Sequence, residues 1–151
     1  MKKLLTPAVI LAVFALDRVS KAAVLARLYQ KSEAVLPFFR LTYAENTGVA
    51  FGMFRDSNLF FMVFSAGLVA ALLLLRRRIQ AHGRLASAGL ALVLGGALGN
   101  LYDRIAYGFV VDFFDVSFFP AVFNVADSAI TVGAFFLALG MKDDKVKQKA
   151  A

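Results

Sequence analysis

The sequence predicts an α-helical integral membrane protein with four transmembrane helices and a small extracytoplasmic platform. Of its 151 residues, 60% are hydrophobic and 18% are charged, whereas soluble domains average roughly 45–50% and about 25%. The apolar residues gather in four runs, each close to the roughly 20 residues that a helix needs to cross a bilayer. The basic residues lie in short clusters between these runs. The net charge of +7 therefore indicates membrane topology, and we expect no nucleic acid partner.

The four runs are expected to form one membrane-embedded domain that covers residues 1–151. They comprise residues 4–28, 59–75, 85–101 and 124–141. Asp17, Arg18 and Lys21 interrupt the first run, and the second contains no charge. Pro120 precedes the fourth run and disfavours helix at the residue before it. The basic start and the apolar stretch after it are also typical of a signal peptide, but without a clear cleavage site before Asp17 a retained helix is expected.

The distribution of basic residues predicts the orientation. They concentrate at the two ends and in the second connection, at Lys2, Lys3, Arg76, Arg77, Arg78, Arg84, Lys142, Lys145, Lys147 and Lys149. Such clusters favour the cytoplasmic side. The first connection is balanced in charge, and the third carries Asp103, Asp112 and Asp115 against Arg104 alone. Both termini are therefore expected in the cytoplasm, which requires an even number of spans and agrees with four.

The first outer connection has the composition of β-structure. Residues 34–46 are rich in aromatic and β-branched side chains and alternate in part between apolar and polar, which is typical of one or two short strands. Pro37 would place such a strand at a sheet edge. Because an open sheet edge cannot face lipid, the strands should lie above the hydrocarbon layer.

Several kinds of chemistry are excluded by composition. The chain has no Cys and a single His, His82. It therefore offers no disulfide, no thiol nucleophile and no cluster of imidazole metal ligands, and a Ser-His-Asp triad is implausible. No metal site is expected.

The polar residues associated with the helices share one depth, near the outer face. They are Asp17 and Lys21 in the first helix, Asn100, Asp103 and Arg104 at the end of the third, Asn124 and Asp127 at the start of the fourth, and Asp112 in the connection between the last two. Ionisable groups within spans are costly and often functional. A transporter or proton relay would need such groups across the whole thickness, so this pattern favours a site at one face.

Most of these residues also have a purely structural interpretation. Asp17 and Lys21 are spaced to form an ion pair on one helix face. Asn124 with Asp127 fits a helix N-cap followed by an acid near the positive end of the dipole. Residues 100–104 suit a hydrogen-bonded helix end, and residues 46–48 suit a turn. Gly95, Gly96 and Gly99 are typical of a surface where another helix packs closely.

Asp112 is harder to explain by structure alone. It is a lone acid within the apolar run of residues 110–114, and burial there should raise its pKa. If Asp112 and Asp127 face one another, one can hold a proton while the other is ionised. Such a pair can activate water for attack on an amide and protonate the leaving nitrogen.

With these residues in view, the chain closely resembles the lipoprotein signal peptidase family, also called signal peptidase II. Five blocks appear in the family's order: DRVSK at 17–21, NTGVAF at 46–51, GGALGNLYDR at 95–104, VVDF at 110–113 and FNVADS at 123–128. The resemblance spans residues 17–133. It implies that Asp112 and Asp127 are the catalytic dyad of an aspartic peptidase.

The resemblance also implies roles for the surrounding residues. Asn46, Gly48, Asn100, Arg104 and Asn124 would bind substrate or support the dyad, while Asp17, Lys21 and Asp103 would be structural. The family's architecture adds an extracytoplasmic β-cradle, placed here at about residues 34–56, and a short surface helix. Two blocks depart from the usual pattern: Arg18 and Ser20 stand where Gln and Thr are more familiar, and Val49 and Gly52 stand for Ala and Ser. The added charge leaves the role of position 18 open.

The family further implies a substrate and a location. The substrate would be a prolipoprotein whose lipobox cysteine carries diacylglycerol, cleaved on the amino side of that cysteine in the bacterial cytoplasmic membrane. A monomer surrounded by membrane lipids, inhibitors of the globomycin type and no cofactor are expected. Two other functional classes remain possible: a proton-coupled carrier, which would need acids at several depths, and a structural membrane adaptor, which would tolerate loss of both aspartates.

Overall fold

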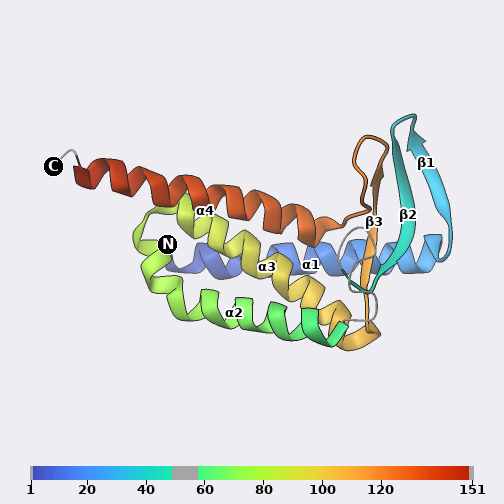
Figure 1. The fold of residues 1–151 in the computed structure, drawn as a ribbon, viewed down its shortest axis with the longest axis horizontal. Coiled ribbons are helices and arrows are strands. Elements are labelled where there is room, and N and C mark those ends of the chain that lie inside the picture. Colours follow the sequence, from blue (N-terminus) through green and yellow to red (C-terminus); the bar gives the residue numbers. More distant parts are fainter. Residues whose placement is uncertain (1, 49–57, 150–151) are drawn as a thin grey trace.

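The protein, a computed structural model that describes residues 2–48 and 58–149, consists of long helices and a small sheet (Figure 1). In chain order the elements are α1 (Lys2–Leu28), β1 (Ser32–Leu36), β2 (Phe39–Asn46), α2 (Asn58–Ala81), α3 (Arg84–Tyr107), β3 (Val110–Val116) and α4 (Val125–Lys149). The sheet lies at one end of the helices, while the two termini and the α2–α3 connection lie at the other end (Figure 1).

Three of the helices are long and apolar enough to cross a membrane. They are Asn58–Ala81, Arg84–Tyr107 and the first part of α4, Val125–Lys142. This confirms the predicted helical membrane class. The helix α1 has 27 residues but contains charged residues in its interior, and its role as a fourth span stays a prediction.

The helices extend beyond the apolar runs from which they were predicted. The expected second helix ended at residue 75, yet α2 continues through three arginines to Ala81. The apolar run measures only the part suited to lipid, and arginine has a high helix propensity, so the helix does not stop where the apolar run stops. At its C-terminal end, α3 is terminated by Gly108, whose φ of 82° allows its N–H to bond to the carbonyl of Arg104.

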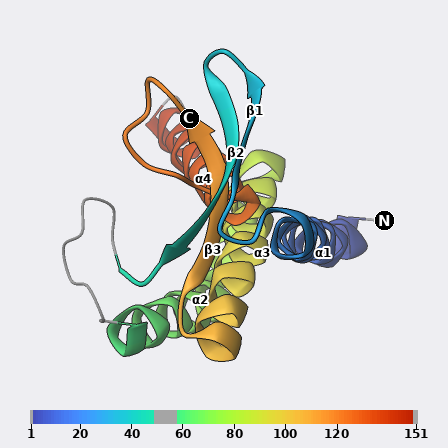
Figure 2. The same ribbon diagram turned by 90° about the vertical axis from the view of Figure 1, so that its right-hand side faces the viewer.

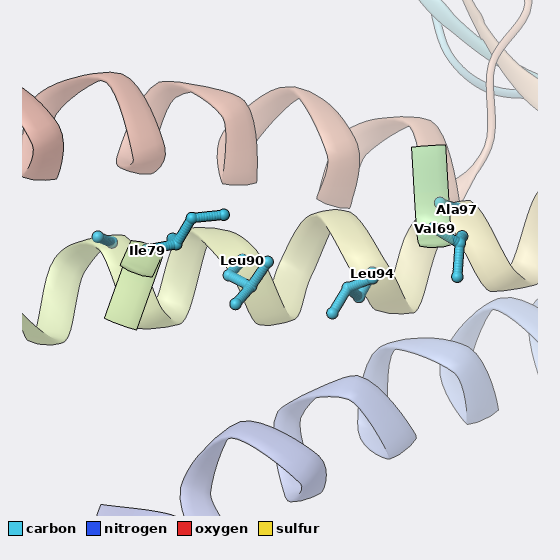
Figure 3. Close-up of a cluster of buried hydrophobic side chains, with 6 residues drawn as sticks. Val69, Ile79, Leu90, Leu94 and Ala97 are labelled. Atoms are coloured by element: carbon cyan, nitrogen blue, oxygen red, sulfur yellow. The ribbon is translucent and has the colours of Figure 1, made fainter. Parts of the chain in front are cut away.

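The helix α3 is the centre of the bundle, with α1, α2 and α4 packed around it (Figure 2). A buried cluster joins Val69 and Ile79 of α2 to Leu90, Leu94 and Ala97 of α3 (Figure 3).

Small residues on α3 let the backbones approach closely. A Cβ atom on Gly95 would lie 2.7 Å from that of Val13 in α1, and one on Gly96 would clash with the carbonyl oxygen of Ala126 in α4. The predicted packing role of these two glycines is therefore confirmed.

The sheet is antiparallel, with the order β1-β2-β3. Strand structure was predicted within residues 34–46 and is confirmed there, but β3 was not predicted. Its first four residues are buried, so it has no alternation of buried and exposed positions to mark it as a strand. No separate short helix occurs within residues 2–48 and 58–149, and the last part of the expected cradle, residues 49–56, lies outside the described residues.

An apolar cluster attaches the sheet to the C-terminal end of α1. Val24 and Leu28 of α1 pack with Val111 and Phe113 of β3. Because Asp112 lies between these two buried β3 residues, the contact with α1 fixes the strand segment that carries it.

Candidate active site

The two aspartates singled out from the sequence lie where the sheet meets the helices. Asp112 is the third residue of β3, and Asp127 lies in the first turn of α4. Asp112 is only 2% exposed. The strand and the helix are consecutive elements that meet at the sheet end of the bundle (Figure 1), so a short connection brings both acids to one place.

Asn124 links the two aspartates. Its backbone N–H donates to Asp127 Oδ2 at 3.2 Å, and its Oδ1 accepts from the Asp127 N–H at 2.8 Å. These reciprocal bonds form a capping box, so the predicted N-cap is confirmed. The same side chain donates from Nδ2 to Asp112 Oδ1 at 2.6 Å. One residue therefore starts α4 and holds the carboxylate of Asp112 beside that start.

Each aspartate has one further amide donor. Asn46 of β2 donates to Asp112 Oδ2 at 2.9 Å, and Asn100 of α3 donates to Asp127 Oδ1 at 2.7 Å. The Asn46 side chain is itself held by the N–H of Gly48, which donates to Asn46 Oδ1 at 3.1 Å. The predicted turn at residues 46–48 thus also orients the amide that binds Asp112.

The pKa of Asp112 is raised to about 7, chiefly by burial and also by the nearby charge of Asp127. The hydrogen bonds from Asn46 and Asn124 and the charge of Lys21 oppose this shift because they favour the ionised carboxylate. Burial dominates, so near neutral pH Asp112 is poised to hold a proton or to release it. Such a group suits general acid–base chemistry.

A charged cluster lies beneath the aspartates, formed by Asp17, Arg18, Lys21 and Asp103. Lys21 Nζ lies 3.0 Å from Asp17 Oδ2 and 2.7 Å from Asp103 Oδ2, which confirms the predicted pair with Asp17. It also donates to Asn100 Oδ1 at 2.9 Å. These three contacts match the three N–H groups of an ammonium. Arg18 Nη2 supplies a second positive charge, 2.8 Å from Asp17 Oδ2 and 2.6 Å from Asp103 Oδ1.

The acids of this cluster bind backbone next to the two aspartates. Asp17 Oδ1 accepts from the N–H of Ala126, and Asp103 Oδ2 accepts from the N–H of Val111, each at 3.2 Å. Ala126 directly precedes Asp127, and Val111 directly precedes Asp112. Each buried acid therefore fixes the backbone one residue before an aspartate of the site.

Two other charged residues are placed differently. Arg104 is within electrostatic range of both aspartates, and its guanidinium lies 5.6 Å from the ring centre of Phe61. Asp115, further along β3, accepts a hydrogen bond from Thr42 at 3.0 Å. The structure thus brings the predicted site residues together at the sheet end of the bundle. Asp115 instead bonds to Thr42 within the sheet.

Sequence reasoning missed two features of the site. It did not predict that Lys21 reaches Asn100, nor that Arg18 joins both buried acids. The spacing of Asp17 and Lys21 signalled their own pair, but a contact across 79 residues leaves no local signal. Within the described residues, no group of three or more His, Cys, Asp or Glu side chains is arranged to hold a metal ion.

The site can be compared with known proteins. Residues 9–142 match the family model described as signal peptidase (SPase) II. The chain belongs to the signal peptidase II family. The lipoprotein signal peptidase of Pseudomonas aeruginosa is 47% identical over 154 residues, covering 92% of this chain and 88% of that protein. The one from Pelotomaculum thermopropionicum is 41% identical, covering 92% of each.

Solved structures of bacterial membrane enzymes share this fold. A bacterial membrane enzyme determined by the in meso method at 2.3 Å resolution has a TM-score of 0.83 and 27% identity, over 93% of this chain and 88% of that one. A second, at 1.9 Å resolution, has a TM-score of 0.78 over 90% and 91% of the two chains. The chain is thus a signal peptidase of the bacterial membrane.

Proposed function

We propose that this signal peptidase II is an aspartic endopeptidase in which Asp112 and Asp127 form the catalytic dyad. The observation that carries the proposal is the position of Asn124, which bonds to Asp112 through its side chain and to Asp127 through both backbone and side chain. Two carboxyl groups held this way, Asp112 buried and Asp127 half-buried, can share one proton and titrate as a pair.

The proposed reaction is direct attack of water on the scissile amide. The ionised aspartate takes one proton from water, and the oxygen forms a bond with the carbonyl carbon. The protonated aspartate then gives its proton to the leaving nitrogen as the C–N bond breaks. The products are a carboxyl group and a free amine, and the dyad ends with one proton, as it began. No cofactor takes part in this scheme.

The neighbouring polar residues divide into two roles. Asn46, Asn100 and Asn124 keep the carboxyl groups oriented, and Gly48 positions Asn46 through its N–H. Arg104 would bind the substrate backbone, because its guanidinium lies near the dyad without a hydrogen bond to any carboxylate among the described residues. Asp17, Lys21 and Asp103 act as a scaffold.

The proposed substrate is a prolipoprotein whose lipobox cysteine carries diacylglycerol, cleaved on the amino side of that cysteine. The depth of the dyad supports this choice, since Asp127 lies in the first turn of a helix suited to span the membrane. The scissile bond of a lipid-anchored signal peptide lies near the same interface. The acyl chains can stay in the bilayer while the peptide enters from the side. We propose that the enzyme acts as a monomer surrounded by membrane lipids.

The proposed topology has four spans, with both termini in the cytoplasm and the dyad at the extracytoplasmic face. The two termini and the α2–α3 connection, which is flanked by arginines at 76–78 and 84, lie at the end of the bundle opposite the sheet (Figure 1). Basic clusters favour the cytoplasmic side. A reporter fused within residues 77–84 should therefore read as cytoplasmic, and an extracytoplasmic signal would overturn the four-span arrangement.

The decisive experiment is cleavage of a diacylglyceryl-modified prolipoprotein in liposomes by wild type, Asp112→Asn and Asp127→Asn at equal folded amounts. Both variants should lose activity by roughly 10²- to 10⁴-fold, the usual contribution of general acid–base catalysis. Asp115→Asn is the matched control, because this acid lies on the same strand and bonds to Thr42. It should cleave normally, and a globomycin-type inhibitor should block the wild type.

Other results would point elsewhere. Near-normal cleavage by Asp112→Asn or Asp127→Asn would overturn the dyad. A structural adaptor would show no cleavage by wild type, and a proton-coupled carrier would instead require acids at several depths.

A further inference from the structure

Five large apolar side chains are exposed at one end of the strands of the sheet. Val35, Leu36 and Phe38 surround the β1–β2 turn, and Phe118 and Phe119 lie in the connection from β3 to α4. Phe118 is 81% exposed, and each of the other four is about half exposed. We call these five residues the apolar tip. A contiguous group of exposed apolar side chains is unusual for a surface that meets only water.

The two segments form one surface. The N–H of Ser117 donates to the carbonyl of Phe38 at 3.0 Å, and the adjacent residues Phe39 and Val116 are paired across β2 and β3. The turn and the connection are therefore held side by side by backbone hydrogen bonds.

The apolar tip projects sideways from the bundle. The strands run across the ends of the helices, and both loops of the tip extend past α4 on the side away from α2 (Figures 1 and 2). Helices that cross a bilayer place such strands parallel to its surface. The tip then lies over the lipid next to α4, where Val132 and Phe135 of that helix are exposed.

The length of α4 sets the height of the tip. The part suited to span the membrane, Val125–Lys142, has 18 residues, or about 27 Å at 1.5 Å per residue. This is slightly less than the thickness of the hydrocarbon layer, which is about 30 Å. Val125 must therefore lie at the outer boundary of that layer, and the connection that directly precedes it lies at the level of the lipid headgroups.

We propose that the apolar tip inserts into the headgroup region of the outer leaflet beside α4. Its occupant is the phospholipid interface, where Phe and Leu side chains of surface-bound segments bury their apolar area at the boundary between headgroups and acyl chains. Insertion would fix the height and tilt of the sheet, and with it β3, which carries Asp112. The proposal requires that α4 crosses the membrane and rests on the proposed orientation for the choice of leaflet. It does not depend on the catalytic role of the aspartates.

The absence of tryptophan from the chain makes a direct test possible. Phe118→Trp and Phe38→Trp each introduce a single fluorescent reporter, one in each segment of the tip. Each variant is reconstituted in liposomes of phosphatidylcholine brominated at shallow or deep acyl positions. Phe135→Trp, on the face of α4 that is exposed to lipid, is the control for a position buried in the membrane. Lys31→Trp, at the far end of the hairpin beside the end of α1, is the water-exposed control.

Both tip reporters should emit to the blue of the Lys31→Trp control and resist acrylamide. Shallow bromines should quench them more than deep bromines, whereas the Phe135→Trp control should respond more to deep bromines. Emission and quenching like those of Lys31→Trp in both tip reporters would overturn the proposal. So would a blue shift that appears only with added prolipoprotein, which indicates substrate docking, or only at high protein density, which indicates self-association. A thermal unfolding midpoint equal to that of wild type verifies that each variant is folded. The two tip reporters lie in different segments, so each tests the proposal independently.

Discussion

Asp17 can approach α3 only because residue 99 is glycine. A Cβ atom on Gly99 would lie 2.5 Å from Asp17 Oδ2 and 3.0 Å from its carboxyl carbon. The same carboxylate receives the N–H of Ala126 through its other oxygen. The small residue on α3 therefore permits a contact between α1 and the backbone directly before Asp127.

Gly99→Ala should destabilise the protein and reduce cleavage. The methyl group would push against a carboxylate that ion pairs hold in place, and overpacking of this kind costs about 1–3 kcal/mol. The measurement is thermal unfolding in detergent together with cleavage rate. Gly67→Ala is the matched control, since a Cβ atom on this α2 glycine meets nothing within 4 Å. Equal unfolding midpoints for the two variants would contradict the packing argument.

Asn124 can be tested for its two roles separately. Asn124→Ala removes the helix cap, at a cost of about 1 kcal/mol, and also the bond to Asp112. Asn124→Ser keeps a capping hydroxyl but lacks the amide that reaches Asp112. The serine variant should therefore keep most of the stability while kcat falls, whereas alanine should lower both. Full activity in the serine variant would show that the bond to Asp112 is dispensable.

The pH dependence of cleavage should reflect Asp112. Its pKa is raised to about 7, mainly by burial, so the proton that the dyad shares is lost as the pH rises through that value. Cleavage should therefore decline above about pH 7. Asn46→Ala removes a hydrogen bond that favours the charged form, which should move the declining limb to higher pH. An unchanged limb in this variant would contradict the assignment.

The same shift has a consequence for stability. The folded protein binds the proton of the Asp112 carboxyl group more tightly than the unfolded chain does. The stabilising contribution of this group to the free energy of unfolding is therefore at its maximum below about pH 4. It is lost as the pH rises towards about 7. Asp112→Asn should therefore weaken the dependence of the unfolding midpoint on pH across this window.

Local spacing was enough to predict the contacts that lie within one helix or at its start. The pair of Asp17 with Lys21 and the cap formed by Asn124 with Asp127 both follow from separations of three or four residues. The bond from Ala126 to Asp17 spans 109 residues, and no periodicity encodes it. The scaffold beneath the dyad depends on how α1 packs against α3 and α4, which the spacing of residues does not determine.

The placement of Asp112 shows a second limit of prediction from the sequence. The sequence marked it as a lone acid in an apolar run, but the run was not predicted as a strand. Fully buried strands lack alternation and resemble any other apolar segment. Its pairing with β2, which brings Asn46 to Asp112, depends on a partner strand 66 residues away.

Arg18 completes the charge balance of the buried cluster. Two acids, Asp17 and Asp103, face two bases, Lys21 and Arg18. The guanidinium also lies 4.6 Å from the ring centre of Tyr102, a geometry that adds a cation–π attraction. The sequence left the role of position 18 open. The structure shows that Arg18 forms ion pairs with both acids.

Arg18→Gln should leave two acids to share Lys21 and should destabilise the protein. Removing one partner of a fully buried ion pair costs about 3–5 kcal/mol, and the effect here should be smaller because the Arg18 side chain is 17% exposed. Adding Asp103→Asn restores neutrality, since the amide oxygen can still accept from Val111. In a double-mutant cycle followed by unfolding in detergent, the second change should therefore cost less in Arg18→Gln than in wild type. Strictly additive losses would mean that Arg18 and Asp103 do not interact energetically, and Arg27→Gln near the end of the same helix controls for loss of charge alone.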